Sequence, residues 1–466
     1  MPEPAAPEAE VYVIQGVAPE IGAYAMAKYS RSALSMRESL RELDGEKAEK
    51  FLNTFYFQYG HRSIADLAHL SFALERLSIL AAIEVVDETR CDGQERSTRY
   101  QAFQRSGFVT PPELAGEASF APAMQALFDA YQGLSERMAE QLAGRHPRPE
   151  TMTPEAYRRT LRARAFDVAR YLLPLATATS LGQIVSARTL EQQIVRLLSS
   201  VYAESRHLGA ALKQAGSAPG AVPTLVKYTD PSAYQINSRA ALAQAAAEVL
   251  AGVAPGAGAR VDLVQPPSLE VELAASLLYP HCHHAYRQIV DAVAALPAPR
   301  REEILALGDA HRGPHDELAR AYQAGLPFQF DLLMDVGGFR DFHRHRRCVQ
   351  LHQEFTAAHG FETPLELEGE AAAGYAGAMT RAGAWVAAHA SPAAAYGLPL
   401  GYRKRSLFKM DLAQAAYMAE LRTGTGGHSS YRSAAWDMYQ AVRRAHPSLA
   451  RGWRVTPPEA GNPLER

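Results

Sequence analysis

The chain has 466 residues, of which 47% are apolar and 21% charged, a composition typical of globular proteins at a length that exceeds one ordinary hydrophobic core. A formal net charge of −2 excludes a global positive field that would attract nucleic acid, so any nucleotide site must be local. The absence of a signal-peptide pattern and of a long apolar run excludes secreted and membrane classes, and three cysteines without C-x-x-C spacing indicate a cytoplasmic protein.

The first half predicts a mixture of strands and helices. We expect a short strand at 11–14, a helix at 25–38, and either a buried helix or a strand followed by a helix at 66–86. Residues 166–212 carry two helical patterns, interrupted at Leu173-Pro174-Leu175 because proline restricts the residue before it.

Stretches rich in proline, glycine and alanine, with an alanine-rich helix between them, predict a linker at 216–258. The second half then repeats the plan of the first, with a strand at 261–264, a helix at 269–278 and a second Leu-Pro-Leu segment at 398–400. This common order predicts a duplicated domain, with the first copy at 1–215 and the second at 259–466.

The first half contains one segment dense in polar chemistry, Gln94-Glu95-Arg96-Ser97-Thr98-Arg99-Tyr100. Arginine offers planar bidentate donors and serine a compact donor, which together suit a phosphate monoester, and glutamate accepts from a ribose hydroxyl. The alternative is a solvated helix end with mixed charges.

The second half contains a cationic segment, Arg340-Asp341-Phe342-His343-Arg344-His345-Arg346-Arg347. Its positive groups repel one another unless solvent or an anion, such as a phosphate or a reduced flavin, relieves them. The alternatives are an exposed basic stripe and a metal site built from His343, His345, Cys348 and His352. We predict no metal site, because the interleaved arginines and the missing C-x-x-C or H-E-x-x-H spacing disfavour a divalent cation.

The two segments resemble the two ends of one motif, R-H-R-x-x-S-x-N-E-x-S-x-R, of the flavin-dependent thymidylate synthases (ThyX). The front matches Arg344-His345-Arg346, and the back matches Glu95, Ser97 and Arg99. Each half lacks the part that the other retains. The replaced positions are Asp87, Glu88 and Thr89 in the first half and His352, Glu354 and Thr356 in the second.

The resemblance extends over roughly residues 10–212 and 260–445. Arg170, ahead of Leu172-Leu173-Pro174-Leu175, matches a family arginine that holds the nucleotide, and the second half has Ala395 there. Arg422 matches an arginine that contacts the pyrimidine ring. An ungapped comparison puts Leu197 at that place in the first half, with Arg196 adjacent.

Further positions match family contacts to the flavin, all of them in the first half. They are Ser30, His61, Ser63 and Arg188.

The resemblance implies an α+β fold in which each of two diverged ThyX-like domains has a small antiparallel sheet packed with long helices. It implies FAD as hydride carrier, methylenetetrahydrofolate as carbon donor, NADPH as reductant and dUMP as the substrate methylated at C5. One composite site per chain and a homodimer that mimics the family tetramer are expected.

The resemblance also implies roles for individual residues. Catalysis is expected from Arg422, Arg344 and Glu95, and flavin binding from Arg344, His345 and Arg346. Nucleotide binding is expected from Glu95, Ser97, Thr98, Arg99, Arg170, Arg422 and Asp341, the last replacing the glutamine that is usual in the family.

Two other functions stay open at this point. The first is a related flavin enzyme that modifies another pyrimidine nucleotide or transfers a different one-carbon group. The second is a catalytically inactive protein that binds flavin or nucleotide and acts as a regulator.

Overall fold

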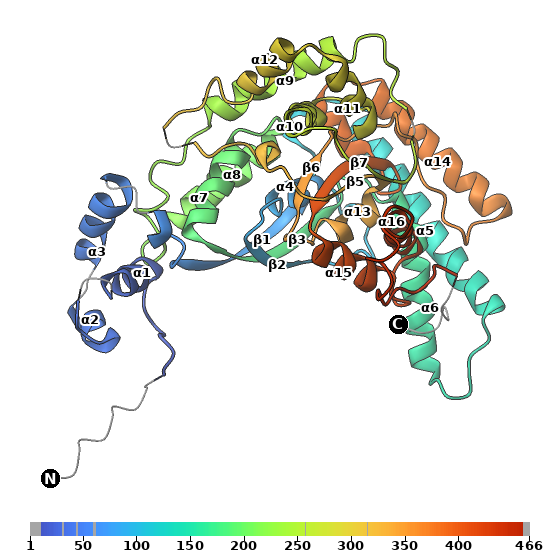
Figure 1. Cartoon of the computed structure of the whole chain (residues 1–466). Coiled ribbons are helices and arrows are strands. Elements are labelled where there is room, and N and C mark those ends of the chain that lie inside the picture. Colours follow the sequence, from blue (N-terminus) through green and yellow to red (C-terminus); the bar gives the residue numbers. More distant parts are fainter. Residues whose placement is uncertain are drawn as a thin grey trace.

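The computed structural model describes residues 11–29, 32–42, 45–58, 62–256, 258–314 and 316–459. Its strands form two antiparallel sheets, a three-stranded one in the order β1-β3-β2 and a four-stranded one in the order β4-β5-β7-β6. Figure 1 shows the two sheets at the centre of the molecule with helices around them. The predicted α+β class with two domains of this kind is confirmed.

The elements of the first half are, in chain order, α1 (Pro19–Lys28), α2 (Met36–Glu42), α3 (Gly45–Leu52), η1 (Asn53–Gln58), η2 (Arg62–Ile64), β1 (His69–Ser78), α4 (Ile79–Val85), β2 (Cys91–Glu95), η3 (Pro112–Leu114), α5 (Phe120–Arg145), α6 (Pro154–Ala169), η4 (Arg170–Leu172), β3 (Ala178–Ser186), α7 (Ala187–Leu198) and α8 (Ala203–Gly216).

The elements that follow are α9 (Ala233–Val249), β4 (Val261–Leu263), α10 (Leu269–Leu278), η5 (Tyr279–His281), α11 (Tyr286–Ala295), α12 (Ala298–Leu307), η6 (Arg320–Tyr322), β5 (Phe328–Asp335), α13 (Val336–Phe342), β6 (Val349–His352), α14 (Gly369–Ala387), η7 (Pro392–Gly397), β7 (Arg403–Met410), α15 (Leu412–Arg422) and α16 (Ser429–Ala445). Within the described residues, no helix combines the length and the hydrophobicity that a bilayer crossing requires.

The same local device starts a helix directly after a strand in both halves. Ser78 ends β1 and accepts a hydrogen bond from the Ala81 backbone N–H at 3.0 Å, and Asp335 ends β5 and accepts one from Gly338 at 2.7 Å. Ser186 and Asp411 cap α7 and α15 in the same way after β3 and β7. Each cap satisfies a backbone donor that the first helical turn leaves unpaired.

The sequence predictions of single elements are confirmed in part. Residues 66–86 form a strand followed by a helix, and the strand at 261–264 and the helix at 269–278 correspond to β4 and α10. The predicted strand at 11–14 is wrong: Val11 is 94% exposed and no neighbouring strand pairs with it in the part of the chain described here.

Two helix predictions also need correction. The helix expected at 25–38 is split into α1 and α2, and the helical pattern assigned to 166–212 hides a strand, β3, between Leu173-Pro174-Leu175 and α7. β3 is the central strand of its sheet, paired on both sides, and contains Gly182. Tertiary pairing therefore overrides a weak local pattern there.

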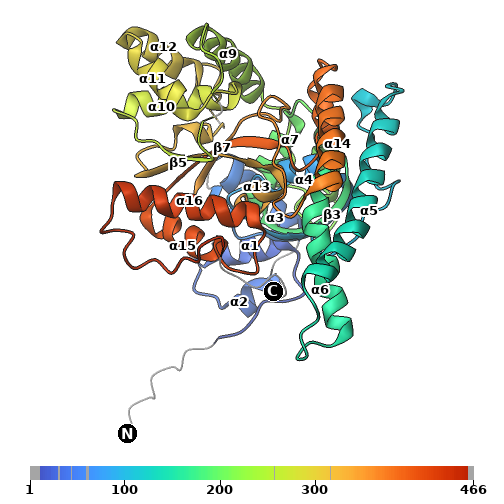
Figure 2. The same cartoon turned by 90° about the vertical axis from the view of Figure 1, so that its right-hand side faces the viewer.

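The segment predicted as a linker, 216–258, contains α9 within it. Leu242, Ala245, Ala246 and Leu250 of this segment pack into a hydrophobic cluster with α10, α11 and α12. Figure 2 shows these four helices grouped over one end of the second sheet. Much of the connecting segment is thus part of the helical layer of the second half.

The two Leu-Pro-Leu segments meet at the seam between the halves. Backbone hydrogen bonds run from Leu175 N to Leu398 O (2.8 Å) and from Leu400 N to Leu173 O (2.9 Å). A second reciprocal pair runs from Ala176 N to Tyr396 O (2.8 Å) and from Gly401 N to Tyr171 O (2.9 Å). Exchanging the two halves maps each bond onto its partner, so the segments pair about an approximate twofold axis.

The largest hydrophobic cluster crosses this seam. It joins Phe128 and Phe166 of the first half to Phe330, Phe339 and Tyr396 of the second, all buried. The long helices α5 and α14 pack together at its edge, where Trp385 donates a hydrogen bond to Ser119 at 2.9 Å (Figure 2). The halves share one core, which fixes how their polar segments face each other.

We predict that the shared core makes the halves unfold together. Leu173→Ala, at a fully buried position in the first half, should lower the free energy of unfolding by ~2–5 kcal/mol, because the seam cannot collapse around the cavity. All three tryptophans, Trp385, Trp436 and Trp453, lie in the second half, so their fluorescence reports on the other side of the seam.

The urea transition followed by tryptophan fluorescence should shift as far as the one followed by circular dichroism. Leu365→Ala is the control; Leu365 is 82% exposed, and its loss should change stability by no more than about 0.5 kcal/mol. A fluorescence transition that Leu173→Ala leaves in place would contradict a common core.

Candidate functional site

The retained segments of the two halves contact each other directly. Arg340 on α13 forms an ion pair with Glu95 at the end of β2, with Nη2 and Oε1 2.6 Å apart, and its Nη1 donates to Thr98 Oγ1 at 3.5 Å. Thr179 on β3 also donates to Glu95, at 3.3 Å. The Glu95 carboxylate is therefore held by one cation and one hydroxyl at the interface of the halves.

Arg99 extends this interface. Its Nε and Nη2 donate to the two oxygens of Asp167, at 2.6 and 3.1 Å, in the bidentate arrangement that suits a guanidinium and a carboxylate. From the second half, the Tyr431 hydroxyl accepts from Nη1 and the Gly426 carbonyl from Nη2, each at 3.3 Å. Although burial by itself raises the pKa of Asp167, the hydrogen bonds and charge of Arg99 lower it to about 2.

Arg422, at the end of α15, also lies close to Tyr431. The guanidinium carbon of Arg422 is 5.7 Å from the centre of the Tyr431 ring, and that of Arg99 is 6.0 Å from it. Asp341 contributes a carboxylate oxygen 3.7 Å from Arg422 Nη1. Two arginines from different halves therefore both lie close to one phenol ring.

His345 holds Arg422 in place. Arg422 Nε donates to His345 Nε2 at 2.8 Å, so Nε2 carries no proton and the His345 ring is neutral. Burial, followed by the charge of Arg422, lowers the pKa of His345 to about 3, so the ring is neutral near pH 7. Burial lowers the pKa of Arg422, and the charge of the nearby, exposed Arg344 lowers it further.

Arg170 belongs to the same group of charged residues and is buried, with an exposed fraction of 3%. Its Nε and Nη2 have no hydrogen-bond partner among the described residues. The charges of Arg170 and Arg99 both act on Asp167 and on the buried His428, whose Nε2 lies 3.0 Å from the Asp167 carbonyl oxygen. A buried guanidinium with free donors favours an anionic ligand at this place.

The residues predicted to contact flavin are less closely grouped. Ser30 and His61 lie outside the described residues, and Ser63 is an exposed residue of η2. Arg188 is held between the halves by Asp66 at 3.2 Å and by Glu317 at 2.8 Å.

A surface cavity of about 370 Å³ lies next to Arg188 and has both Asp66 and Asp92 in its lining. Arg346 Nη1 lies 3.6 Å from Asp92, so Arg188 and Arg346 each contact a carboxylate of the same cavity. Arg346 Nε is buried without a hydrogen-bond partner in the described part of the chain. The volume is in the range of small-molecule sites.

The positions where the first half has lost the R-H-R sequence form a second polar network. Arg196 donates through Nε and Nη2 to Glu88 at 2.9 and 2.8 Å, as Arg422 donates to His345 in the other half. Leu197, which corresponds to Arg422 in an ungapped comparison of the two halves, is fully buried in a hydrophobic cluster. Arg196 is thus the counterpart of Arg422 in space.

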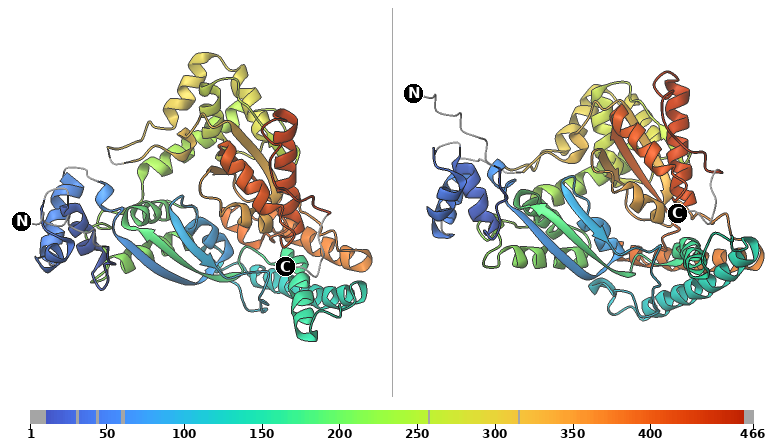
Figure 3. Two further views of the ribbon diagram at one scale, coloured as in Figure 1. Left: turned by 60° about the horizontal axis from the view of Figure 1, so that its bottom comes forward. Right: turned by 90° about the horizontal axis from the view of Figure 1, so that it is seen from below.

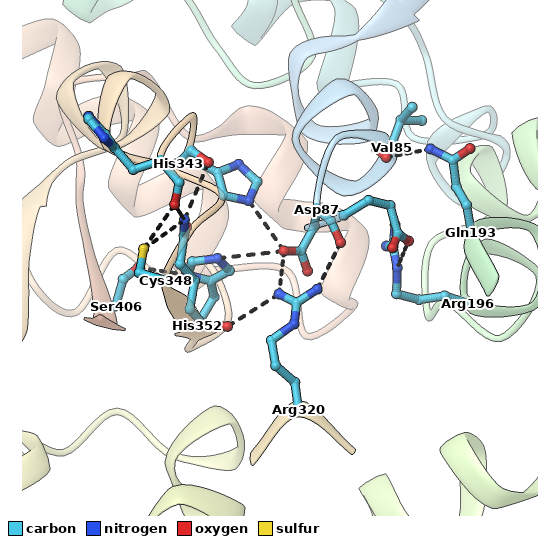
Figure 4. A network of polar contacts seen from close by, with 12 residues as sticks. Val85, Asp87, Gln193, Arg196, Arg320, His343, Cys348, His352 and Ser406 are labelled. Atoms are coloured by element: carbon cyan, nitrogen blue, oxygen red, sulfur yellow. Dashed lines mark hydrogen bonds and ion pairs between the residues drawn. The ribbon is translucent and has the colours of Figure 1, made fainter. Parts of the chain in front are cut away.

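Asp87 lies in the same network with residues of the second half. Arg320 Nη1 donates to its Oδ1 at 2.6 Å, and His343 Nε2 and His352 Nε2 lie 3.3 and 3.9 Å from that oxygen (Figure 4). The four residues grouped in the sequence as alternative metal ligands are therefore separated: His345 faces Arg422 and Cys348 donates to the His345 carbonyl, whereas His343 and His352 face Asp87.

Sequence reasoning missed three residues of the site: Asp167, Arg340 and Tyr431. Asp167 precedes Arg170 by three residues on a helix, and Arg340 begins the cationic segment, so local spacing offered a signal for both. Tyr431 lies in α16 with no such signal, because only the tertiary fold brings it close to both Arg99 and Arg422.

The family model of the thymidylate synthase complementing proteins matches residues 13–215 and 324–448. A UPF0159 protein of Chlamydia pneumoniae is 26% identical over 483 residues, covering 94% of this chain and 90% of the relative. A UPF0159 protein of Thermoplasma acidophilum is 26% identical over 91% of this chain and 93% of the relative.

A flavin-dependent thymidylate synthase of Clostridium tetani is 25% identical over 218 residues, covering 46% of this chain and 83% of that enzyme. Among solved structures, thymidylate synthase X of Helicobacter pylori with FAD and dUMP is similar at 17% identity and a TM-score of 0.31, covering 45% of this chain and 93% of that one.

We predict that the neutral state of His345 makes stability depend on pH. The folded pKa of about 3 lies below the unfolded value of about 6.5, so protons favour the unfolded state in this window. The contribution of His345 is complete above about pH 6.5 and falls as the pH is lowered, by up to about 1.4 kcal/mol per unit, until about pH 3.

His345→Gln removes the titrating group and keeps an acceptor for Arg422. Urea unfolding between about pH 4.5 and 6.5 should show wild-type stability falling more steeply than that of the variant. Parallel pH dependences would contradict the assignment of a neutral, buried His345.

Proposed function

The chain belongs to the thymidylate synthase complementing protein family, and we propose that it is a cytoplasmic, FAD-dependent thymidylate synthase-like methyltransferase. Its reaction would be the reductive C5-methylation of dUMP, with methylenetetrahydrofolate as carbon donor and NADPH as reductant, at one composite site per chain. The observation that carries the proposal is that Arg99 and Arg422, from different halves, both approach Tyr431, with guanidinium carbons 6.0 and 5.7 Å from the centre of its ring.

The first half would bind the phosphate of the nucleotide. Arg170 offers two buried donors that no described residue of the chain pairs with, and Arg99 is held in the same cluster by its bidentate bond to Asp167. Ser97 and the buried Thr98 add hydroxyl groups beside Arg99. Two guanidiniums and two hydroxyls match the oxygens of a phosphate monoester.

The second half would act on the pyrimidine ring. Because Arg422 Nε is bound to the neutral His345, its terminal nitrogens are positioned to stabilise negative charge on a ring carbonyl as C5 becomes nucleophilic. Glu95, fixed by Arg340 and Thr179, would accept a hydrogen bond from the sugar. The protein would supply position and electrostatics, without an amino-acid nucleophile.

FAD would be held by Arg344, His345 and Arg346, with Arg188, Ser63, Ser30 and His61 as further contacts. The buried Nε of Arg346, which pairs with nothing in the described ranges of the chain, and the cavity next to Arg188 fit an anionic group that extends along this surface. When bound, FAD supplies the hydride chemistry. The arginines of the chain would neutralise its negative charges.

A related enzyme acting on another pyrimidine nucleotide is the second candidate, favoured by Asp341. A carboxylate only accepts hydrogen bonds, whereas the glutamine usual in the family also donates. With its carboxylate 3.7 Å from Arg422, Asp341 would select a base edge that presents a donor, such as an exocyclic amino group. A protein that binds ligands without turnover is the remaining outcome of the tests below.

We also propose that two chains associate as a homodimer that mimics the four-domain family assembly. One face of the first sheet has no helix over it in the view of Figure 3. The central residues of β3 alternate between buried and exposed, and Ile184 is 51% exposed. A second copy would cover this face. Light scattering is expected to give twice the chain mass of 50.8 kDa, and a monomer would contradict the proposal.

Arg422→Ala should lower kcat about 10²–10³-fold, the usual effect of removing one donor that stabilises transition-state charge. Bound FAD, measured by its visible absorption after purification, should be retained. The matched control is Arg347→Ala: this arginine lies in the cationic segment, but its side chain is 72% exposed and pairs with Asp411 at the surface. Equal activity of both variants would contradict the role of Arg422.

Complementation of a thymidine-requiring strain tests the substrate. The wild-type chain is expected to restore growth without thymidine, and Arg99→Ala is expected to fail because the phosphate contact is lost. The synthase would be rejected if the wild-type chain fails to restore growth and the purified protein, although it contains FAD, does not turn over dUMP. The second candidate or an inactive binding protein would then remain.

A further inference from the structure

The network around Asp87 brings three potential metal ligands together across the seam. One ligand atom each from Asp87, His343 and His352 lies within 4.8 Å of the other two (Figure 4). We propose that these residues form a binding site for a divalent transition-metal ion that links the two halves. The site lies where the first half has lost the R-H-R sequence, and it is independent of the proposed methyltransferase activity.

The distances suit such an ion. Ligand atoms about 2.0–2.1 Å from a tetrahedral Zn²⁺ are roughly 3.3 Å apart. His343 Nε2 is 3.3 Å and His352 Nε2 is 3.9 Å from Asp87 Oδ1. Both distances to Asp87 lie within 0.6 Å of the tetrahedral value, and the two imidazole nitrogens lie within 4.8 Å of each other, so a small inward movement of the side chains would close the site around an ion.

His352 provides a second, independent observation. Its Nε2 atom is inaccessible to solvent and has no hydrogen-bond partner in the described residues, which is uncommon for a buried polar atom. Its Nδ1 lies 3.1 Å from Ser406 Oγ. If Nδ1 carries the proton and donates it to Ser406, the lone pair of Nε2 points toward Asp87, as in histidines that bind metals.

Arg320 has two opposing effects on a cation at this site. Its charge repels the ion, but its bonds to the Asp87 carboxylate (2.6 Å) and carbonyl (2.9 Å) fix the ligand, as outer partners of metal-bound carboxylates do. The Glu88 carboxylate also acts on Arg320 and offsets part of its charge. The repulsion is the same for every divalent cation, and it is the two imidazole ligands that disfavour hard cations such as Mg²⁺, which prefer oxygen ligands.

Two imidazoles and one carboxylate, with a fourth position left for water, are a ligand set for Zn²⁺ or Co²⁺. The purified full-length chain, stripped with a chelator, should bind one Co²⁺ and show the visible absorption of a tetrahedral complex. Zn²⁺ should displace this spectrum. A wild-type chain that binds no Co²⁺ or Zn²⁺ at one-to-one stoichiometry would overturn the proposal.

Variants identify the ligands. His352→Asn removes the ε nitrogen and keeps a donor for Ser406, and His343→Asn removes the other ring; each should abolish the Co²⁺ spectrum. Ser406→Ala should weaken Co²⁺ binding about 10–100-fold, as expected for an outer partner. The control is His359→Ala, which breaks a different pair of histidine rings, His283 and His359, with centres 5.8 Å apart.

Thermal melting without metal shows whether each variant folds. Added Zn²⁺ should raise the melting temperature of the wild type and of His359→Ala, because the ion binds only the folded chain. It should not raise that of His352→Asn. Co²⁺ binding that survives in both asparagine variants, or that is lost in His359→Ala, would overturn the assignment.

Discussion

The reciprocal pairing of the two Leu-Pro-Leu segments is the constraint on which the rest of the molecule depends. Four backbone hydrogen bonds between residues 171–176 and 396–401 set the halves about an approximate twofold axis. The first helical residue of α4 and that of α13 are bound in equivalent ways. Ile79 N donates to Thr177 O, just before β3, and Val336 N donates to Tyr402 O, just before β7. This places α4 opposite α13, so the loop after each helix meets the strand end of the other half.

Two polar sites result from this symmetry, and their chemistry has diverged. At one, Arg99 and Arg422 lie close to Tyr431, and the charge of the buried Arg170 acts on Asp167, the partner of Arg99. At the other, Asp87 faces His343 and His352, and the family motif is lost on both sides. The same backbone arrangement therefore holds a group of arginines in one place and a carboxylate with two imidazoles in the other, because charges at a few positions have changed sign.

The sequence predicted the fold class, the duplication and the meeting of the two retained segments, because the Glu95–Arg99 and Arg344–Arg346 groups complement each other. It missed β3, whose pairing on both sides is non-local, and it assigned a strand to 11–14 from apolar spacing alone. Tyr431 and Asp167 were also missed, since their role follows from α16 and α6 converging on Arg99. Long-range packing, rather than local pattern, decides these features.

Covalent continuity between the halves has a kinetic consequence. A site divided between separate subunits forms only when the subunits associate, and it is lost on dilution. Association costs about 4–15 kcal/mol in translational and rotational freedom. The Arg99–Tyr431–Arg422 cluster forms inside one polypeptide, so its assembly is a first-order folding event whose yield is the same at any protein concentration. The amino-acid sequence of each half can also change independently of the other, whereas in a homo-oligomer every substitution appears in all subunits at once.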